Sequence, residues 1–360
     1  DQIPSWTLVI GKGYPVIGVV DQEWKQWTGH LTGSWTPKLD FTDETMLYAS
    51  YSRGYKGGGA NPPSVVPIGF AGGILASSPS AATHPLTFEP EFVNAYEIGT
   101  KNSLFDGSLT LNGDVFLYDY KNYQISTIVD RTSINLNFDA TVKGAELVAN
   151  WEPVPGLRFN FAGGYEDSSL AKGSQAIDLM DRTAGHAGWM LVKPFVSQTS
   201  NCILPTAVVN QMISQYRANN GGSNSQPVPR DPNGENNGLD VNSGMILACL
   251  YAYTVGLDPR VLLGIDTTGS EFDPATKPNG GAGFSKDLEG NDLPNTPHVT
   301  LSFGAQYSMP LSTDWVGTLR GDFYAQTGSW ARVFNDDPYD RIHGYTNLTF
   351  ALTFTNQDGW

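Results

Sequence analysis

The sequence contains no apolar run that approaches the ~20 residues needed for a membrane-spanning helix. Basic residues are also scarce, since 21 Lys and Arg stand against 36 Asp and Glu and the formal charge is −15. This charge argues against a nucleic-acid partner, because phosphate binding needs a basic face. The scarcity of helix-type repeats and the high aromatic content instead fit an all-β protein.

Cysteine is nearly absent, and its two copies fall in one long region without strand periodicity. Cys202 and Cys249 both lie in Gly- and Asn-rich sequence. Such a pair favours a disulfide, and therefore an oxidising compartment or the cell surface. The alternative is two unpaired buried thiols. No signal peptide precedes Asp1, so we expect either that one has been removed or that the chain belongs to something longer.

Catalytic and metal-binding motifs are missing as well. The five histidines show no metal-ligand spacing, and there is no Gly-x-Ser-x-Gly motif. Gly57–Gly59 follows an expected strand but opens no helix, which disfavours a phosphate loop. The sequence therefore predicts no enzyme, no bound metal and no cofactor.

A strict two-residue alternation is what the chain does contain. From Val299 to Ser308, apolar or aromatic residues alternate with small or polar ones. Successive side chains of a strand point to opposite faces, so this segment has one apolar and one wet side. Comparable segments predict strands at 24–36, 45–56, 90–103, 108–120, 135–151, from 157 to about 170, 297–309, 315–329 and 345–355, with a turn at 356–359.

The connections between these segments alternate between short and long. Short turns are expected at Pro37–Asp43, Leu104–Gly107, Glu152–Gly156 and Pro310–Asp314, and longer connections at 57–87, 130–133, 171–295 and 332–343. This order puts every short turn on one rim and every long loop on the other, as in an outer-membrane barrel. The predicted fold is therefore an all-β, antiparallel transmembrane β-barrel of up-and-down hairpins, with short periplasmic turns and long extracellular loops.

Polar and charged side chains occupy alternate positions in these expected strands, so that they share one face. They are Glu97, Glu146, Asn150, Arg158, Asn160, Arg320 and Asp322. Charges at these positions would be costly against lipid but are normal in a wet barrel interior. We therefore assign them to the lumen.

The connection at 171–295 is long enough to have structure of its own. Val208, Val209, Met212, Ile213 and Tyr216 recur at helical spacing, with Thr206 as the expected cap. Ser243–Tyr253 is a second apolar segment of possible helical character. A Cys202–Cys249 bridge would fold this region into an extracellular loop subdomain.

Several motifs, in order along the chain, resemble the barrels of TonB-dependent outer-membrane receptors. The matching segments are Leu47–Gly59, Asn94–Lys101, Gly107–Ile125, Val142–Leu147, Pro155–Leu157, Leu293–His298 and Asn335–Arg341. The resemblance identifies residues 1–360 as part of such a barrel. It implies 22 strands, an N-terminal plug and a TonB-contacting segment for a complete family member.

Only about 9–10 strands are counted here, and nothing resembles the plug or the last strands. We therefore expect a fragment of a longer receptor. The resemblance implies TonB-coupled import of a scarce nutrient, most often an iron–siderophore complex, in the outer membrane of a Gram-negative bacterium. It also implies outer-membrane lipid and, through the plug, the TonB complex as partners. The alternatives are a passive porin-like or autotransporter barrel and a secreted β-sandwich that binds glycans or acts as an adhesin.

Substrate contacts are expected near the rim that carries the long loops. The candidates are Arg53, Arg131, Trp330 and Arg332, because arginine and aromatic side chains suit anionic, conjugated ligands. Tyr51 and Tyr55 share the parity of Leu47 and Ala49 and are assigned to an interfacial aromatic girdle.

Overall fold

The computed structural model describes residues 21–61, 85–129, 132–192, 202–219, 248–249, 251–270, 272–273 and 276–356. The expected turn at 356–359 and most of the expected loop at 57–87 lie outside these ranges. Within the described part of the chain, no helix has the length and apolar character to cross a membrane.

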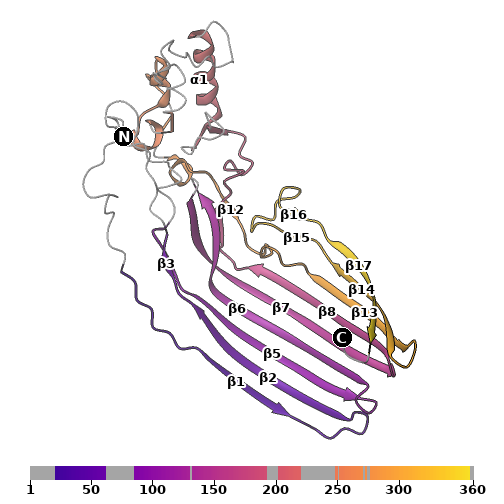
Figure 1. The fold of residues 1–360 in the computed structure, drawn as a ribbon. Coiled ribbons are helices and arrows are strands. Elements are labelled where there is room, and N and C mark those ends of the chain that lie inside the picture. Colours follow the sequence, from indigo (N-terminus) through magenta and orange to yellow (C-terminus); the bar gives the residue numbers. More distant parts are fainter. Residues whose placement is uncertain are drawn as a thin grey trace, which may run out of the picture.

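One antiparallel sheet of nine strands dominates the described residues (Figure 1). Its strands, in spatial order, are β1 (Gly29–Trp35), β2 (Glu44–Lys56), β5 (Glu91–Leu104), β6 (Leu109–Val129), β7 (Thr132–Val154), β8 (Leu157–Leu170), β13 (Val299–Pro310), β14 (Trp315–Gln326) and β17 (Tyr345–Asn356). Spatial order equals chain order throughout, and β1 and β17 are the two edges. The sheet is continuous and open, which confirms the barrel-type fold class and removes the sandwich alternative.

Four short connections lie at one end of this sheet, which we call the turn end. They join β1 to β2, β5 to β6, β7 to β8 and β13 to β14 (Figure 1). The longer connections, including the one between β8 and β13, lie at the opposite or loop end. The predicted placement of short turns and long loops therefore holds for three of the four loop-end connections, whereas the connection expected at 130–133 is reduced to the two residues between Val129 and Thr132.

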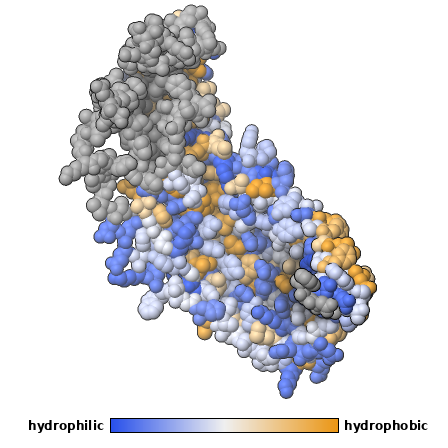
Figure 2. Space-filling view, viewed as in Figure 1, coloured by the Kyte–Doolittle hydropathy of each residue, from blue (hydrophilic) through white to orange (hydrophobic). Residues whose placement is uncertain are grey.

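The strand register gives the sheet a polar and an apolar face. Glu97 stands opposite Ser50, Asp114 opposite Glu146, and Asn150 opposite Asn160. The expected lumen residues all share this polar face, because directly paired residues of antiparallel strands point to the same side. Figure 2 shows hydrophilic residues over much of the sheet in this view, and hydrophobic ones gathered at the edge where β14 and β17 lie.

Large side chains of the apolar face are exposed along most of its strands. Examples are Ile98, Val115, Leu147, Phe303, Leu319 and Phe350, of which Phe350 retains 71% of its accessible surface. A patch of this extent is unfavourable in water, so this face requires an apolar environment.

Aromatic residues border the apolar face at both ends. Trp151, Tyr307 and Trp315 lie next to the turns, while Tyr51 and Tyr96 lie toward the loop end with ring centroids 5.2 Å apart.

Charged pairs lie near the same end, one of them in the register row of Tyr51 and Tyr96. Lys143 lies 3.0 Å from Asp167, and Lys121 lies 3.3 Å from Asp119. The apolar surface is therefore a band bounded by aromatic residues at each end.

The expected strand limits needed correction at several places. The first strand begins at Gly29 rather than residue 24, and the strand expected over 315–329 ends at Gln326. The strand expected over 108–120 continues to Val129, and its partner begins at Thr132 rather than residue 135. A bulge between Tyr120 and Tyr123 lets the hairpin continue. Asn122 takes a positive φ of 56° there, and its amide donates to Asp139 Oδ1 at 3.0 Å.

Short elements occupy the connections. They are β3 (Gly59–Ala60), β4 (Thr87–Phe88), β9 (Gln175–Ile177), β10 (Trp189–Val192), β11 (Cys202–Pro205), α1 (Thr206–Asn219), η1 (Tyr251–Val255), η2 (Pro259–Leu263), η4 (Pro278–Gly281), β12 (Ser285–Asp287), β15 (Ser329–Trp330) and β16 (Arg341–Ile342). The strand β16 falls within the loop expected at 332–343 and pairs with β15, which precedes that loop.

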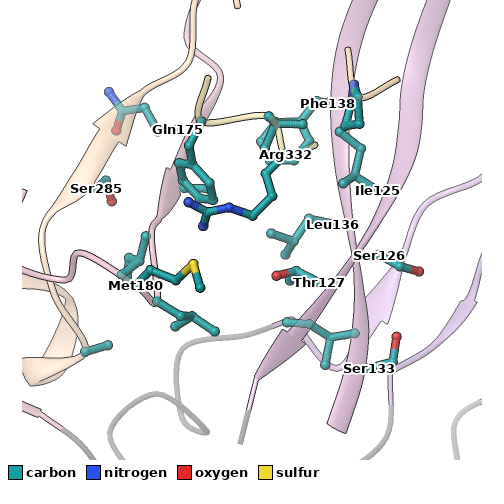
Figure 3. A pocket seen from close by; sticks show the side chains of 18 of the residues that line it. Ile125, Ser126, Thr127, Ser133, Leu136, Phe138, Gln175, Met180, Ser285 and Arg332 are labelled. Carbon is teal, nitrogen blue, oxygen red and sulfur yellow. The ribbon is translucent and has the colours of Figure 1, made fainter. Parts of the chain in front are cut away.

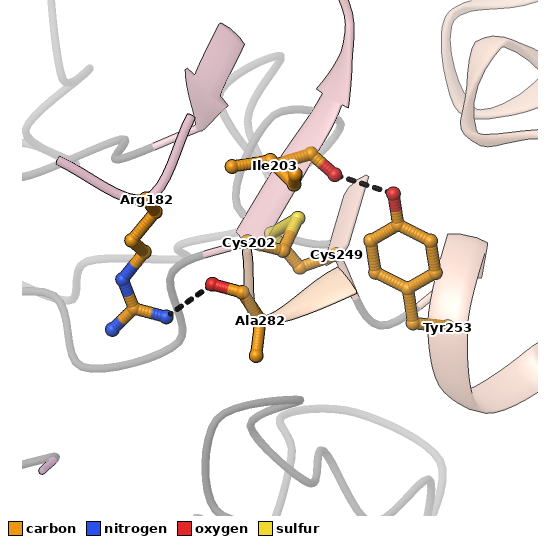
Figure 4. Close-up of a disulfide and its surroundings, with 6 residues drawn as sticks. All are labelled: Arg182, Cys202, Ile203, Cys249, Tyr253 and Ala282. Carbon is orange, nitrogen blue, oxygen red and sulfur yellow. Dashed lines mark hydrogen bonds between the residues drawn. A yellow bond between two sulfur atoms is a disulfide. The ribbon is translucent and has the colours of Figure 1, made fainter. Parts of the chain in front are cut away.

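The connection between β8 and β13 contains a core of its own around α1. Val208, Val209 and Met212 of the helix are buried against Leu204 and Leu263. A disulfide joins Cys202 to Cys249, with Cα atoms 5.7 Å apart (Figure 4). Beside it, the Tyr253 hydroxyl donates to the Ile203 carbonyl, and Arg182 Nη1 donates to the Ala282 carbonyl at 3.2 Å.

Candidate functional site

The polar face changes character toward the loop end, where it becomes apolar. Along β7 this face presents Asn150 and Glu146 near the turn end, but Val142, Ala140 and Phe138 beyond Gly144. The latter three are buried, together with Leu288, Leu293 and Val333 from the connections. The loop-end part of the wall is therefore covered by returning chain.

A cavity of about 800 Å³ lies within this covered region (Figure 3). Its strand wall is the β6–β7 hairpin beyond the bulge, where Ile125 pairs with Leu136. Opposite this wall lie β9 with the residues that follow it and the segment 331–334. The lining residues are Ile125, Ser126, Thr127, Ser133, Ile134, Leu136, Phe138, Gln175, Ala176, Ile177, Leu179, Met180, Asn279, Ala282, Ser285, Pro294, Ala331, Arg332, Val333 and Phe334.

An ion-pair network closes one side of the cavity. Arg332 Nη1 lies 2.7 Å from Asp178 Oδ1, and Arg332 Nε lies 2.6 Å from Asp340 Oδ1. Both carboxylates are almost fully buried. The network joins the connection after β8 to the connection after β14.

Lys286 extends the same network. Its ammonium lies 3.3 Å from Asp178, 3.0 Å from Asp181 and 2.7 Å from Asp336. Three segments of the chain that are far apart in sequence are thus joined through charged side chains.

The network holds Asp178 and Lys286 in their charged forms. Burial raises the pKa of Asp178, but hydrogen bonds from Arg332 and the Met180 amide outweigh this and leave the pKa below its ordinary value. Burial lowers the pKa of Lys286, yet hydrogen bonds with Asp336 and Asp181 raise it above its ordinary value. Asp178 and Lys286 are therefore both ionised at neutral pH.

The three predicted substrate residues that the structure describes, Arg53, Trp330 and Arg332, do not gather at one place. Arg332 lines the cavity, with its guanidinium committed to the two carboxylates. Trp330 lies beside it, where its Nε1 donates to Asp292 Oδ2 at 3.2 Å and the Arg341 guanidinium stands 4.8 Å from its ring centroid.

Arg53 lies away from the cavity. Arg53 follows the apolar face near the loop end, where it donates to Asn94 Oδ1 at 3.0 Å and lies 5.0 Å from the Phe92 ring centroid. Arg131 lies outside the described residues.

The apolar residues that form the strand wall of the cavity were not predicted from the sequence. Ile134, Leu136, Phe138, Ala140 and Val142 alternate at the parity assigned to a wet lumen, although all five are apolar. Along β7, the residues on this one face change from polar to apolar, and this change can be seen in the sequence. It marks the point beyond which this face of the strand is covered by other segments of the chain instead of by water.

The sheet and its two faces define a class of protein. A continuous antiparallel wall with an aromatic-bounded apolar band on one side and charged residues on the other is the architecture of a membrane-spanning β-barrel.

The family model described as TonB dependent receptor-like, beta-barrel, matches residues 4–189, just over half of the chain. The chain belongs to this family of outer-membrane receptors, which confirms the resemblance seen in its motifs.

Two solved structures are among those similar to the chain. The ferric yersiniabactin uptake receptor FyuA from Yersinia pestis is 14% identical over 90% of this chain, with a TM-score of 0.44. BauA, the ferric preacinetobactin receptor from Acinetobacter baumannii, is 12% identical over 90% of this chain, with a TM-score of 0.42. The chain spans 29% of the length of each. The comparison with curated protein sequences gives no match.

Proposed function

We propose that this chain is part of the wall of an outer-membrane receptor that imports a scarce nutrient by TonB-coupled transport. Membership of the receptor family is the observation that carries the proposal. The two-faced sheet supports it, because the apolar band suits lipid and the charged face suits an aqueous interior. The loop end then faces the outside of the cell, and the cavity lies where a ligand arriving from outside would first meet the wall.

A ferric siderophore is the cargo that we propose. Its support is the family and the printed names of structures similar to this chain, which are ferric-chelate receptors. Direct substrate contact is proposed for Arg332 and Trp330, which lie at the cavity and beside it. For Arg53, whose guanidinium lies over a ring on the apolar face, the lipid interface is the better-supported position.

The region at 171–295 is proposed as an extracellular subdomain over the barrel mouth. Its own core and the Cys202–Cys249 bridge support this, because a periplasmic or extracellular location permits disulfides.

Radiolabelled iron uptake tests the proposal in cells that express the full-length receptor. Uptake from supplied ferric siderophores should occur in cells with TonB and fall to background in cells without it. Equal uptake in both strains would contradict active transport and favour the passive porin-like alternative. The autotransporter alternative predicts no uptake in either strain.

A further inference from the structure

We infer that the cavity at the loop end takes an uncharged, mainly apolar molecule. This inference rests on the proposed transport function and makes its cargo more specific. If the cargo carries iron, the molecule is a neutral chelate rather than an anionic one.

The cavity walls give the first reason. Ile125, Leu136 and Phe138 line the cavity from the strands and Met180 lies across from them (Figure 3), and the lining also includes Val333 and Phe334. Enclosing hydrocarbon or aromatic surface between such walls is favourable by about 25 cal/mol per Å² of apolar area removed from water. A heavily hydrated anion would lose its solvation there without compensation.

The charge balance at the cavity gives the second reason. Arg332 is the sole charged member among the described residues that line it, and both Asp178 and Asp340 lie within hydrogen-bond distance of its guanidinium. The whole network sets two cations, Arg332 and Lys286, against four carboxylates, those of Asp178, Asp181, Asp336 and Asp340. An anion in the cavity would therefore meet a net negative environment.

The polar groups of the lining complete the assignment. Thr127, Ser133 and Ser285 offer hydroxyls, and Gln175 offers an amide. A few neutral donors and acceptors among apolar walls orient a ligand by hydrogen bonds to its hydroxyl, carbonyl or amide groups. A volume of about 800 Å³ lies within the range of small-molecule sites.

A matched pair of probes tests this preference: 2-naphthol, which is neutral at pH 7, and its anionic 6-sulfonate. The reporter is Met180→Cys in the full-length receptor held in lipid nanodiscs. Met180 lines the cavity yet is 77% exposed, so the substitution spares the fold. Both cysteines of this chain are in the disulfide, and labelling of the unsubstituted full-length receptor gives the background to subtract.

The readout is the rate of maleimide labelling at residue 180. At a free concentration about four times its Kd, 2-naphthol should slow labelling about fivefold, while the sulfonate at the same concentration should have no effect. Ser312→Cys, in an exposed turn at the opposite end of the sheet, should label at an unchanged rate with either probe. Thr127→Cys, on the other wall, serves as a second reporter.

Two results would overturn the inference: protection by the sulfonate equal to or greater than that by 2-naphthol, or protection by neither probe while the control thiol labels normally. Uptake in cells is a separate readout. If uptake in cells does not depend on TonB but 2-naphthol still slows labelling at residue 180, the transport proposal is wrong. The inferred preference of the cavity for uncharged molecules is then still supported.

Discussion

The nine-stranded sheet and the inserted region between β8 and β13 are stabilised in different ways. In the sheet, each strand pairs with the strand before and after it in the chain, and the faces follow from alternation alone. In the insert, a short helix, a disulfide and individual ion pairs hold the chain. Regular backbone pairing tolerates many side-chain changes, whereas the insert depends on single contacts. The two regions should therefore respond differently to the same kind of mutation.

Breaking the ion pair that links the insert to the connection after β14 should have the largest effect on stability. In Arg332→Gln, the buried Asp178 loses its strongest partner, and removing one member of a buried pair costs about 3–5 kcal/mol. The matched change in the sheet is Arg320→Gln, whose partner Asp322 is exposed to solvent, so the loss of stability should be small. Hydrogen exchange around β9 should rise in the first variant only. Equal hydrogen exchange around β9 in both variants would contradict the proposed difference between the insert and the sheet.

A charge placed on the apolar face should destabilise the sheet almost as much. Leu147→Arg puts a cation in the middle of the apolar band, at a cost of about 2–4 kcal/mol if that band faces lipid.

The neighbouring change Glu146→Arg falls on the polar face and serves as its control. Denaturant titration of each full-length variant folded into lipid vesicles compares the two. A similar loss in both variants would mean that the faces are wrongly assigned.

Removing the disulfide should loosen the insert without changing the sheet. The double variant Cys202→Ser, Cys249→Ser reopens a link across 47 residues, worth about 2–4 kcal/mol. Limited proteolysis should then cut within the insert, while the strands keep their protection. Cleavage or exchange that rises equally in β7 and β8 would show that the two regions are not independent.

Mild acid should have the smallest effect on the stability of the ion-pair network. Since the pKa of Asp178 is lowered in the folded chain, its ionised form adds stability above the unfolded pKa of about 3.9, and this stability is lost as pH falls through the folded value. Between about pH 5 and 8, the exchange at β9, corrected for its intrinsic rate, should stay constant. A rise in that range would mean that another group controls the network.

The same contrast explains how far the sequence alone could lead. Strand order, turn placement and the assignment of Glu97, Glu146 and Arg320 to one face were predictable, because alternation and turn residues act over short distances. The helix at Thr206–Asn219 was also predictable from its apolar spacing. The approach of Asp178 to Arg332 was not, because 154 residues separate them and neither belongs to a repeating pattern.

The predicted limits of β6 and β7 were wrong for a local reason. The positive φ at Asn122 shifts the register by a bulge, which simple alternation does not anticipate.

Depth-dependent fluorescence quenching along β8 tests the two-faced wall most directly. Bimane would be attached in turn to Phe159→Cys, Asn160→Cys, Phe161→Cys and Ala162→Cys in the full-length receptor, folded into vesicles that contain brominated lipid. The register places Phe159 and Phe161 on the apolar face and Asn160 and Ala162 on the polar face. Strong quenching at 159 and 161 with little at 160 and 162 is the predicted result. Uniform quenching, or none at any position, would contradict a wall with one lipid face and one lumen face.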